Sequence, residues 1–202
     1  MGEGVRRHDT PNLIRGQRGT GLFVHVPRTG GQSLAMVLAV SRDTHLTALE
    51  LRSRVTEDLW NDSLRFAVVR NPWDHYVSWY LYTHGLGDAD DHAGEIRRFR
   101  VWVRNGCPRE SHQWENRQPV DPLDQLKFLC DADGELLVRV VCFHRLRDAY
   151  GWLVSRLGLP YRVLPHRSKS TRLRYQDYYD DHCQKIVAEQ RDAEVRRFRF
   201  SF

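Results

Sequence analysis

Residues 22–40 read LFVHVPRTGGQSLAMVLAV, and this stretch decides the fold class of the chain. It begins with a short apolar run that is dense in β-formers and ends at Pro27, which is the pattern of a buried strand. Gly30 and Gly31 follow as a turn, and the apolar run over residues 33–40 predicts a helix. The stretch therefore predicts a strand, a tight glycine turn and a helix in immediate succession.

The same order of elements recurs further along the chain. Residues 66–69 are typical of a second buried strand, and Asp74 is the expected N-cap of the helix after it. The other expected elements are helices over 48–60, 93–104 and 146–157, a β-rich stretch over 136–143 and a final helical region over 178–198. Strands that alternate with helices predict an α/β fold, a single domain whose central parallel sheet is flanked by helices. In such sheets, ligands bind beyond the carboxyl ends of the strands.

Length and composition agree with one globular domain. The chain has 202 residues, of which 41% are hydrophobic and 28% charged, and this excludes an intrinsically disordered chain. The polar residues 1–20 are predicted to form a mobile arm, and residues 21–202 the domain. The net charge is +5, and arginine supplies nearly all of the positive charge. Because the planar guanidinium suits bidentate binding of phosphate, sulfate and carboxylate, this excess favours an anionic partner.

The sequence predicts a cytoplasmic protein without a membrane partner. Its best apolar run, over residues 34–40, is far too short to span a bilayer, and residues 1–20 lack the apolar core of a signal peptide. The cysteines are far apart and form no C-x-x-C pair, so reduced thiols are expected. They are Cys107, Cys130, Cys142 and Cys183. Histidines and cysteines do not show the spacing of a zinc site, and no metal is expected.

The glycine turn carries the groups that a phosphate site needs. Glycines let the backbone approach a ligand, and the free N–H groups and dipole at the start of a helix favour an anion. Arg28 adds charge, and the hydroxyls of Thr29 and Ser33 add donors. The expected phosphate-binding residues are Pro27, Arg28, Thr29, Gly30, Gly31, Gln32, Ser33 and Leu34.

A candidate second pair of phosphate ligands follows the second strand, and the alternative is an Arg paired with a carboxylate beside a solvent-facing Ser. Arg70 is expected at the carboxyl end of that strand, and Ser78 two turns into the next helix. A guanidinium and a hydroxyl in this arrangement can grip one phosphate group.

Both elements resemble those of sulfotransferases that use 3'-phosphoadenosine-5'-phosphosulfate (PAPS). Residues 25–33 resemble the "H-x-P-K-T-G-G-T-S" loop of carbohydrate sulfotransferases and their bacterial relatives. Residues 70–80 resemble the "R-N-P-x-D-R-x-x-S-x-Y" element of the same family. Three positions differ, because Arg28 replaces lysine, Gln32 replaces a common threonine and His75 stands where the family often has arginine.

The resemblance implies a P-loop-like sulfotransferase architecture. It also implies transfer of the sulfuryl group of PAPS to an acceptor hydroxyl, which leaves 3',5'-adenosine bisphosphate (PAP). It assigns Arg28 to the leaving group, and Arg70 with Ser78 to the 3'-phosphate. A late basic loop would add contacts to the nucleotide through Arg167, Ser168 and Lys169. The implied partners are the nucleotide donor and a small-molecule or glycan acceptor, with no metal and no nucleic acid.

The resemblance also implies a catalytic base between the two elements. His45 precedes an expected helix, as does the histidine base of the heparan and uronyl branches. A neutral imidazole with a pKa of about 6.5 can take a hydroxyl proton at neutral pH. The alternatives that the sequence leaves open are His25, His84, His112, Glu50 and Glu57.

Three other functions stay open. A P-loop phosphotransferase, such as a small-molecule kinase, would use ATP and Mg²⁺, but the lysine of the G-x-x-x-x-G-K-[ST] loop is absent. A nucleic-acid binder would use the positive charge, but no binding motif supports it. A relative that binds the nucleotide without catalysing transfer is the third, because Arg28 replaces the lysine.

The acceptor does not follow from the sequence. Residues 84–120 either shape an acceptor cleft or pack in the core, and their conspicuous side chains are His92, Trp102, His112 and Trp114. By family analogy a sugar hydroxyl is favoured, and the oligomeric state stays unknown.

Overall fold

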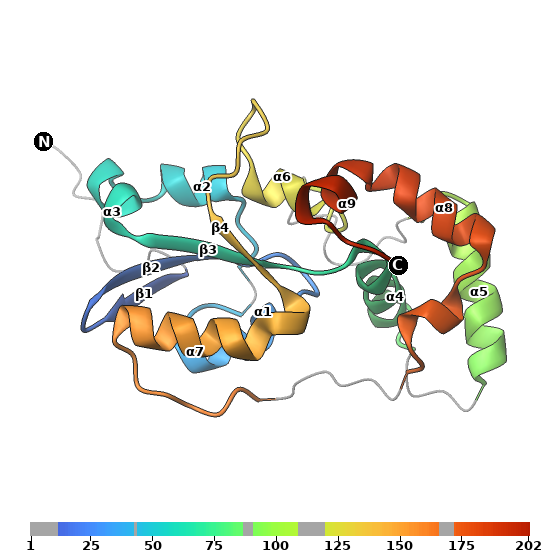
Figure 1. Cartoon of the computed structure of the whole chain (residues 1–202), viewed down its shortest axis with the longest axis horizontal. Helices are drawn as coiled ribbons and strands as arrows, with labels where there is room; N and C mark the ends of the chain where they lie inside the picture. Colours follow the sequence, from blue (N-terminus) through green and yellow to red (C-terminus); the bar gives the residue numbers. More distant parts are fainter. Residues whose placement is uncertain (1–11, 43, 87–90, 109–119, 166–171) are drawn as a thin grey trace, which may run out of the picture.

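The chain folds around a four-stranded sheet in the order β1-β2-β3-β4 (Figure 1). The computed structural model describes residues 12–42, 44–86, 91–108, 120–165 and 172–202. The strands are β1 (Leu13–Gly16), β2 (Gly19–Val24), β3 (Leu64–Val69) and β4 (Arg139–Cys142). The α/β class with flanking helices is confirmed, but the sheet is mixed, because β1 is antiparallel to β2 whereas β2, β3 and β4 are parallel.

The antiparallel strand comes from a segment that the sequence analysis assigns to the mobile arm. Residues 13–20 instead form β1 and the beginning of β2, joined by a two-residue turn after Gly16. Ile14 is 2% exposed in the core, and the N–H of Arg18 donates to the carbonyl of Leu157, 3.0 Å away. The segment is too short and polar to show a strand pattern, and its conformation is set by its partner β2.

Side chains of the parallel strands alternate between two apolar layers. Leu22 and Val24 point to one layer and Phe23 to the other, as the period of a strand requires. The first layer is covered by α2 (Ala48–Ser53), α3 (Glu57–Asp62) and α6 (Gln125–Leu129). The second layer is covered by α1 (Gly31–Leu38) and α7 (Leu146–Leu157) (Figure 1). Helices on both faces explain why the buried residues of β2 and β3 are apolar on both sides of the sheet.

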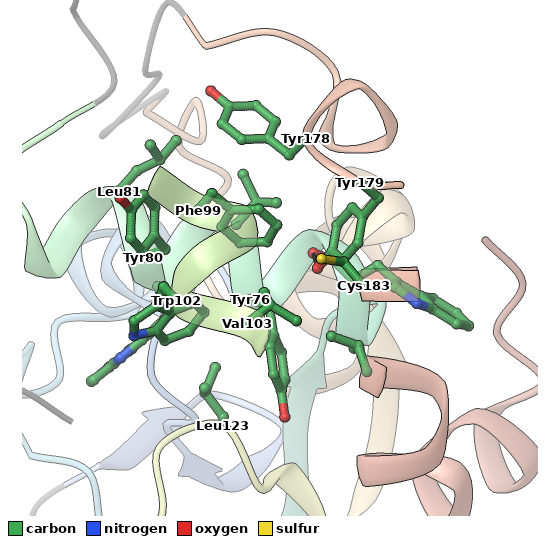
Figure 2. Close-up of a cluster of buried hydrophobic side chains, with 14 residues drawn as sticks. Tyr76, Tyr80, Leu81, Phe99, Trp102, Val103, Leu123, Tyr178, Tyr179 and Cys183 are labelled. Carbon is green, nitrogen blue, oxygen red and sulfur yellow. Dashed lines mark hydrogen bonds between the residues drawn. The ribbon is translucent and has the colours of Figure 1, made fainter. Parts of the chain in front are cut away.

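A third core lies beyond the carboxyl ends of the parallel strands (Figure 1). Its elements are α4 (Pro72–Thr83), α5 (His92–Arg104), the 3-10 helix η2 (Tyr175–Tyr178), α8 (Asp181–Gln190) and α9 (Asp192–Phe198). Figure 2 shows its rings packed together, among them Tyr80, Phe99 and Trp102. Trp102 is 6% exposed and therefore packs in the core. Of the two predicted roles, acceptor cleft or core packing, the structure gives it the second.

Most expected helices are found, and the structure corrects two expectations about where helices begin. The helix predicted over 48–60 is two helices, because the hydroxyl of Thr56 accepts the N–H of Leu59 and caps a new helix there. The N-cap of α4 is Asn71, not Asp74, since the Asn71 side chain accepts the N–H of Trp73 and Pro72 occupies the first turn. Asp74 is thereby free for a different partner. Within the described ranges, no helix is both long and apolar enough to cross a membrane.

The tight contact between β1 and the end of α7 predicts a sensitive glycine. A Cβ on Gly16 would lie 1.9 Å from the backbone oxygen of Leu157, which cannot rotate away. We expect Gly16→Ala to lower the free energy of unfolding by about 1–3 kcal/mol, measured by urea denaturation. The matched control is Gly151→Ala in α7, where no atom lies within 4 Å of the added Cβ, and which should be neutral or stabilising. Equal stability of the two variants would contradict the contact.

Candidate functional site

The carboxyl ends of the three parallel strands bring three segments together. Arg70 follows β3 directly, and Phe143 begins the 3-10 helix η1 (Phe143–Arg145) directly after β4. The Arg70 guanidinium carbon lies 4.4 Å from the centre of the Phe143 ring. The same ring would lie 2.7 Å from a Cβ on Gly30, which belongs to the turn after β2. The predicted convergence of strand ends is therefore present.

The turn between β2 and α1 depends on its two glycines. Gly30 is the N-cap of α1 with a φ of 84° and provides no side-chain acceptor to the first turn of the helix. A Cβ on Gly31 would lie 2.0 Å from the ring of His25, so only glycine lets the turn pack on that ring. Backbone N–H groups at such a helix start are donors for an anion.

The other predicted residues of the turn divide between scaffold and surface. The hydroxyl of Thr29 donates to the carbonyl of Val26 at 2.9 Å and braces the turn. Leu34 is fully buried in the core, Ser33 is 8% exposed, and Gln32 is exposed. Thus Thr29 and Leu34 hold the shape of the turn, whereas Gln32 faces solvent.

Arg70 is the best-anchored side chain of the site. It is 8% exposed, its Nε donates to Asp74 Oδ2 at 2.6 Å, and its Nη1 donates to the carbonyl of Arg28 at 2.9 Å. Burial lowers the pKa of Arg70, and the Asp74 carboxylate counteracts this effect. Arg70, which the sequence predicts as a phosphate ligand, therefore joins the ends of β2 and β3 through its own guanidinium group.

Arg172 is a site residue that the sequence analysis does not single out. Its Nη2 donates to Asp74 Oδ1, so Asp74 holds Arg70 on one oxygen and Arg172 on the other. Burial alone would raise the pKa of Asp74, but the two guanidinium groups hold it below its ordinary value. Arg172 lies at the edge of the predicted basic loop, and the residues chosen there, Arg167, Ser168 and Lys169, lie outside the described residues.

Arg28 brings a third guanidinium group to the same place. Its φ is 59°, and its guanidinium carbon lies 4.3 Å from the centre of the Tyr82 ring. Burial, then the charge of Arg70, lowers the pKa of Arg28 to about 10, so the group stays cationic at neutral pH. Asp74, Ser78 and Tyr82 are each four residues apart in α4 and hence lie on one face of it. Ser78, which is 6% exposed, thus sits between the Asp74 ion pairs and the Arg28–Tyr82 stack.

We name Arg28, Arg70 and Arg172 the arginine cluster. Two of its N–H groups are buried without an acceptor, because no described residue accepts a hydrogen bond from Nε of Arg28 or Nη1 of Arg172. Among the described residues, Asp74 pairs with Arg70 and Arg172, and burial, then the charges of both arginines, lowers the pKa of Arg28. Buried donors and unbalanced positive charge are costly without a ligand, so the geometry suits an anion with several oxygens.

Three buried histidines support the turn. His75 is fully buried, and its Nε2 donates to the carbonyl of Pro27 at 2.9 Å, which ties α4 to the turn. His45 is 4% exposed, and its Nδ1 donates to the carbonyl of His25 at 2.9 Å. That bond places the proton on Nδ1, so the neutral ring carries its lone pair on Nε2. The rings of His25 and His45 lie 4.2 Å apart, and burial, then the charge of His45, keeps the pKa of His25 well below its usual value.

The alternative bases have other roles or lie elsewhere. Glu50 accepts the N–H of Thr47 at 2.7 Å in a capping box, and Glu57 pairs with Arg52 at the surface. His84 Nδ1 donates to the carbonyl of Tyr80 at 2.8 Å. His112 and Trp114 lie outside the described residues.

The described part of the chain holds no group of three or more His, Cys, Asp or Glu side chains arranged to bind a metal ion. The four cysteines form no disulfide.

In comparisons with known proteins, no protein-family model, no curated protein and no solved structure matches this chain.

Burial of His75 predicts a loss of stability on the acid side. The pKa of His75 falls from 6.5 to about 3, chiefly through burial and then through the charge of Arg70. An unfolded histidine takes up a proton below 6.5 whereas the folded one does not, so stability is present above 6.5 and is lost as the pH falls towards 3. We expect His75→Gln, whose amide can still donate to Pro27, to lose less stability in this window, by up to about 1.4 kcal/mol per pH unit.

The measurement is urea denaturation of both proteins between about pH 7 and pH 5. His182→Gln, at an exposed position of α8, is the control and should keep the pH dependence of the parent. Parallel curves for His75→Gln and the parent would contradict the neutral, buried histidine.

Proposed function

We propose that this chain is a sulfotransferase that moves the sulfuryl group of PAPS to the hydroxyl of a sugar or a small natural product. One observation carries the proposal, namely the arginine cluster beside the glycine turn, with two buried N–H groups that find no acceptor among the described residues. The two sequence elements that resemble the sulfotransferase family supply two of its three arginines. Spatial convergence of those elements is what a donor carrying two separate phosphate groups requires.

The two ends of the cluster suit the two anionic ends of the donor. The Gly30–Gly31 turn and Arg28 would receive the 5'-phosphosulfate, since the turn offers N–H groups at the start of α1. Arg70 and Ser78 would receive the 3'-phosphate, with Arg172 as an additional ligand. The buried Nη1 of Arg172 supports this addition, because it needs an acceptor that the described residues do not provide.

The proposed reaction is an in-line transfer. The acceptor oxygen attacks sulfur, a new O–S bond forms, and the bond between sulfur and the bridging oxygen of the 5'-phosphate breaks. Negative charge grows on that phosphate, where the cation of Arg28 and the N–H groups of the turn would stabilise it. With a pKa of about 10, Arg28 acts as a cation and not as a proton donor at neutral pH. The products are PAP and a sulfate ester.

His45 is the proposed general base. Its Nδ1 is committed to the carbonyl of His25, so Nε2 of the neutral ring is the atom that would take the acceptor proton. The neighbouring His25 ring lies 4.2 Å away, and burial, then the charge of His45, keeps the pKa of His25 well below its usual value. Of the two rings, His45 is therefore the one proposed to take the acceptor proton.

Nucleotide binding is the first test. PAP should bind without metal and more tightly than 5'-AMP, and Arg70→Ala should remove that preference with a loss of about 100-fold in affinity. Arg172→Ala should weaken PAP binding about tenfold, because it leaves Asp74 and the 3'-phosphate without a second cation. Isothermal titration calorimetry with PAP, 5'-AMP and ATP measures these affinities.

Arg104→Ala is the matched control, because Arg104 pairs with Asp180 away from the cluster and should leave affinity unchanged. Equal affinity for PAP and 5'-AMP in the parent would contradict the sulfotransferase proposal. Tighter binding of ATP with Mg²⁺ would instead support the alternative, a phosphotransferase.

Replacement of the base separates catalysis from binding. His45→Ala should lower turnover by about 10²–10⁴-fold and leave PAP affinity within about twofold. Release of PAP in the presence of a panel of hydroxyl acceptors is the readout. Unchanged turnover would reject His45 as the base, and tight binding without turnover in the parent would identify the catalytically impaired alternative.

A further inference from the structure

The backbone of Arg70 is held by a buried side chain from another helix. Gln125, at the start of α6, has a side chain that is 0% exposed. Its Oε1 accepts the N–H of Arg70 at 2.8 Å, and its Nε2 donates to the carbonyl of Arg70 at 2.9 Å. The amide group thus pairs with the backbone of Arg70 as a neighbouring strand would, just where β3 ends. This pairing fixes the direction in which the guanidinium leaves the strand.

Gln125 is itself held by a buried carboxylate. Glu194 of α9 is 1% exposed and accepts two hydrogen bonds from Gln125. Its Oε1 accepts the backbone N–H at 2.9 Å, and its Oε2 accepts Nε2 at 2.6 Å. The carboxylate therefore orients the amide, so that Nε2 faces both Glu194 and the carbonyl of Arg70. Burial of an ionisable group for one glutamine is expensive, and a hydrophobic contact would serve packing better.

We propose that Gln125 and Glu194 are positioning residues for Arg70, and that their hydrogen bonds hold its guanidinium ready for an anion. We name these two residues the Gln125–Glu194 clamp. The inference rests on the proposed anion site but not on sulfuryl transfer. The clamp links α9 to the backbone of Arg70 through two side chains.

The charge on Glu194 gives the clamp a pH dependence. The groups that face Glu194 are Gln125, Arg191 and Asp124. Burial raises the pKa of Glu194 to about 7, against the hydrogen bonds of Gln125 and the charge of Arg191, and Asp124 raises it further. Below this pH one oxygen carries a proton and becomes a poor acceptor, so one of the two bonds to Gln125 weakens. The clamp is therefore tighter above about pH 7 than below it.

Sulfate binding tests the clamp, because sulfate keeps the same charge from pH 6 to pH 8, in contrast to phosphate. In the parent, sulfate affinity measured by NMR titration should fall several-fold between about pH 8 and about pH 6. Glu194→Gln should match the parent at about pH 6 and be several-fold weaker at about pH 8, since it cannot gain the charge. Similar pH profiles for the two proteins would overturn the proposal.

Gln125→Met provides an independent variant, because methionine keeps the volume and loses the hydrogen bonds. It should weaken sulfate binding about tenfold and speed hydrogen exchange of the Arg70 amide. Gln190→Met is the control, since it loses one hydrogen bond, from Tyr76 at 3.0 Å, and should alter neither readout. Equal effects of the two variants would reduce the clamp to a structural role and overturn the proposal.

The exchange measurement separates this inference from the proposed function. If the parent binds neither sulfate nor PAP, the anion site fails. Unchanged exchange of the Arg70 amide in Gln125→Met would then refute the clamp as well. Faster exchange in that variant, with sulfate binding by the parent but no preference for the 3'-phosphate of PAP, would support the clamp and reject the sulfotransferase.

Discussion

The buried guanidinium group of Arg70 is the interaction on which the rest of the site depends. It leaves the end of β3, stacks on Phe143 after β4 and donates to the carbonyl of Arg28 after β2. A cation removed from water is stable only where partners replace the lost hydration, and Asp74 is the partner with opposite charge. The guanidinium group thus joins the ends of the three parallel strands, through a hydrogen bond to the segment after β2 and a stack on the ring after β4. The glycines of the turn complete the arrangement, since any side chain there would meet His25 or Phe143.

The same charge that organises the site also leaves it unbalanced. Asp74 pairs with Arg70 and Arg172, but one carboxylate balances only one positive charge, and burial, then the charges of Arg70 and Arg172, lowers the pKa of Arg28. Cations held this close together raise the free energy of the unliganded protein, and an anion would lower it. Pre-organised donors gain more from a multivalent anion than flexible surface arginines do, because little conformational entropy remains to be lost. The cluster is therefore better suited to binding than to stability.

Local signals in the sequence were enough for most of the fold. The apolar strands, the glycine turn and the ends of α7 follow from residue patterns that act within a few positions. The role of β1 could not be predicted, because Ile14 becomes a core residue only through pairing with β2. Trp102 illustrates the same difficulty, since an aromatic residue beside a site and one in the core look identical in sequence.

The candidate site likewise contains residues that the sequence predicts and residues that only the tertiary structure brings to it. Arg28, Arg70 and Ser78 could be predicted from their places beside strand and helix ends together with the resemblance to two sulfotransferase elements. Arg172 could not, since it joins the cluster across 98 positions of sequence through Asp74. Asp74 looked like a helix cap because caps and ion-pair partners use the same residue type, and Asn71 with Pro72 had already supplied the cap.

Arginine at position 28 changes what this turn can do. A φ of 59° is unfavourable for a residue with a side chain, by about 1–3 kcal/mol, and it persists only where neighbours hold it. Here the carbonyl of Arg28 is fixed by Arg70, and the planar guanidinium stacks on Tyr82. Lysine could keep the charge but has no flat face to stack and no Nε donor to aim. Compared with a lysine, Arg28 therefore offers an oriented charge in place of a mobile one, and Tyr82 belongs to the candidate site because it fixes that orientation.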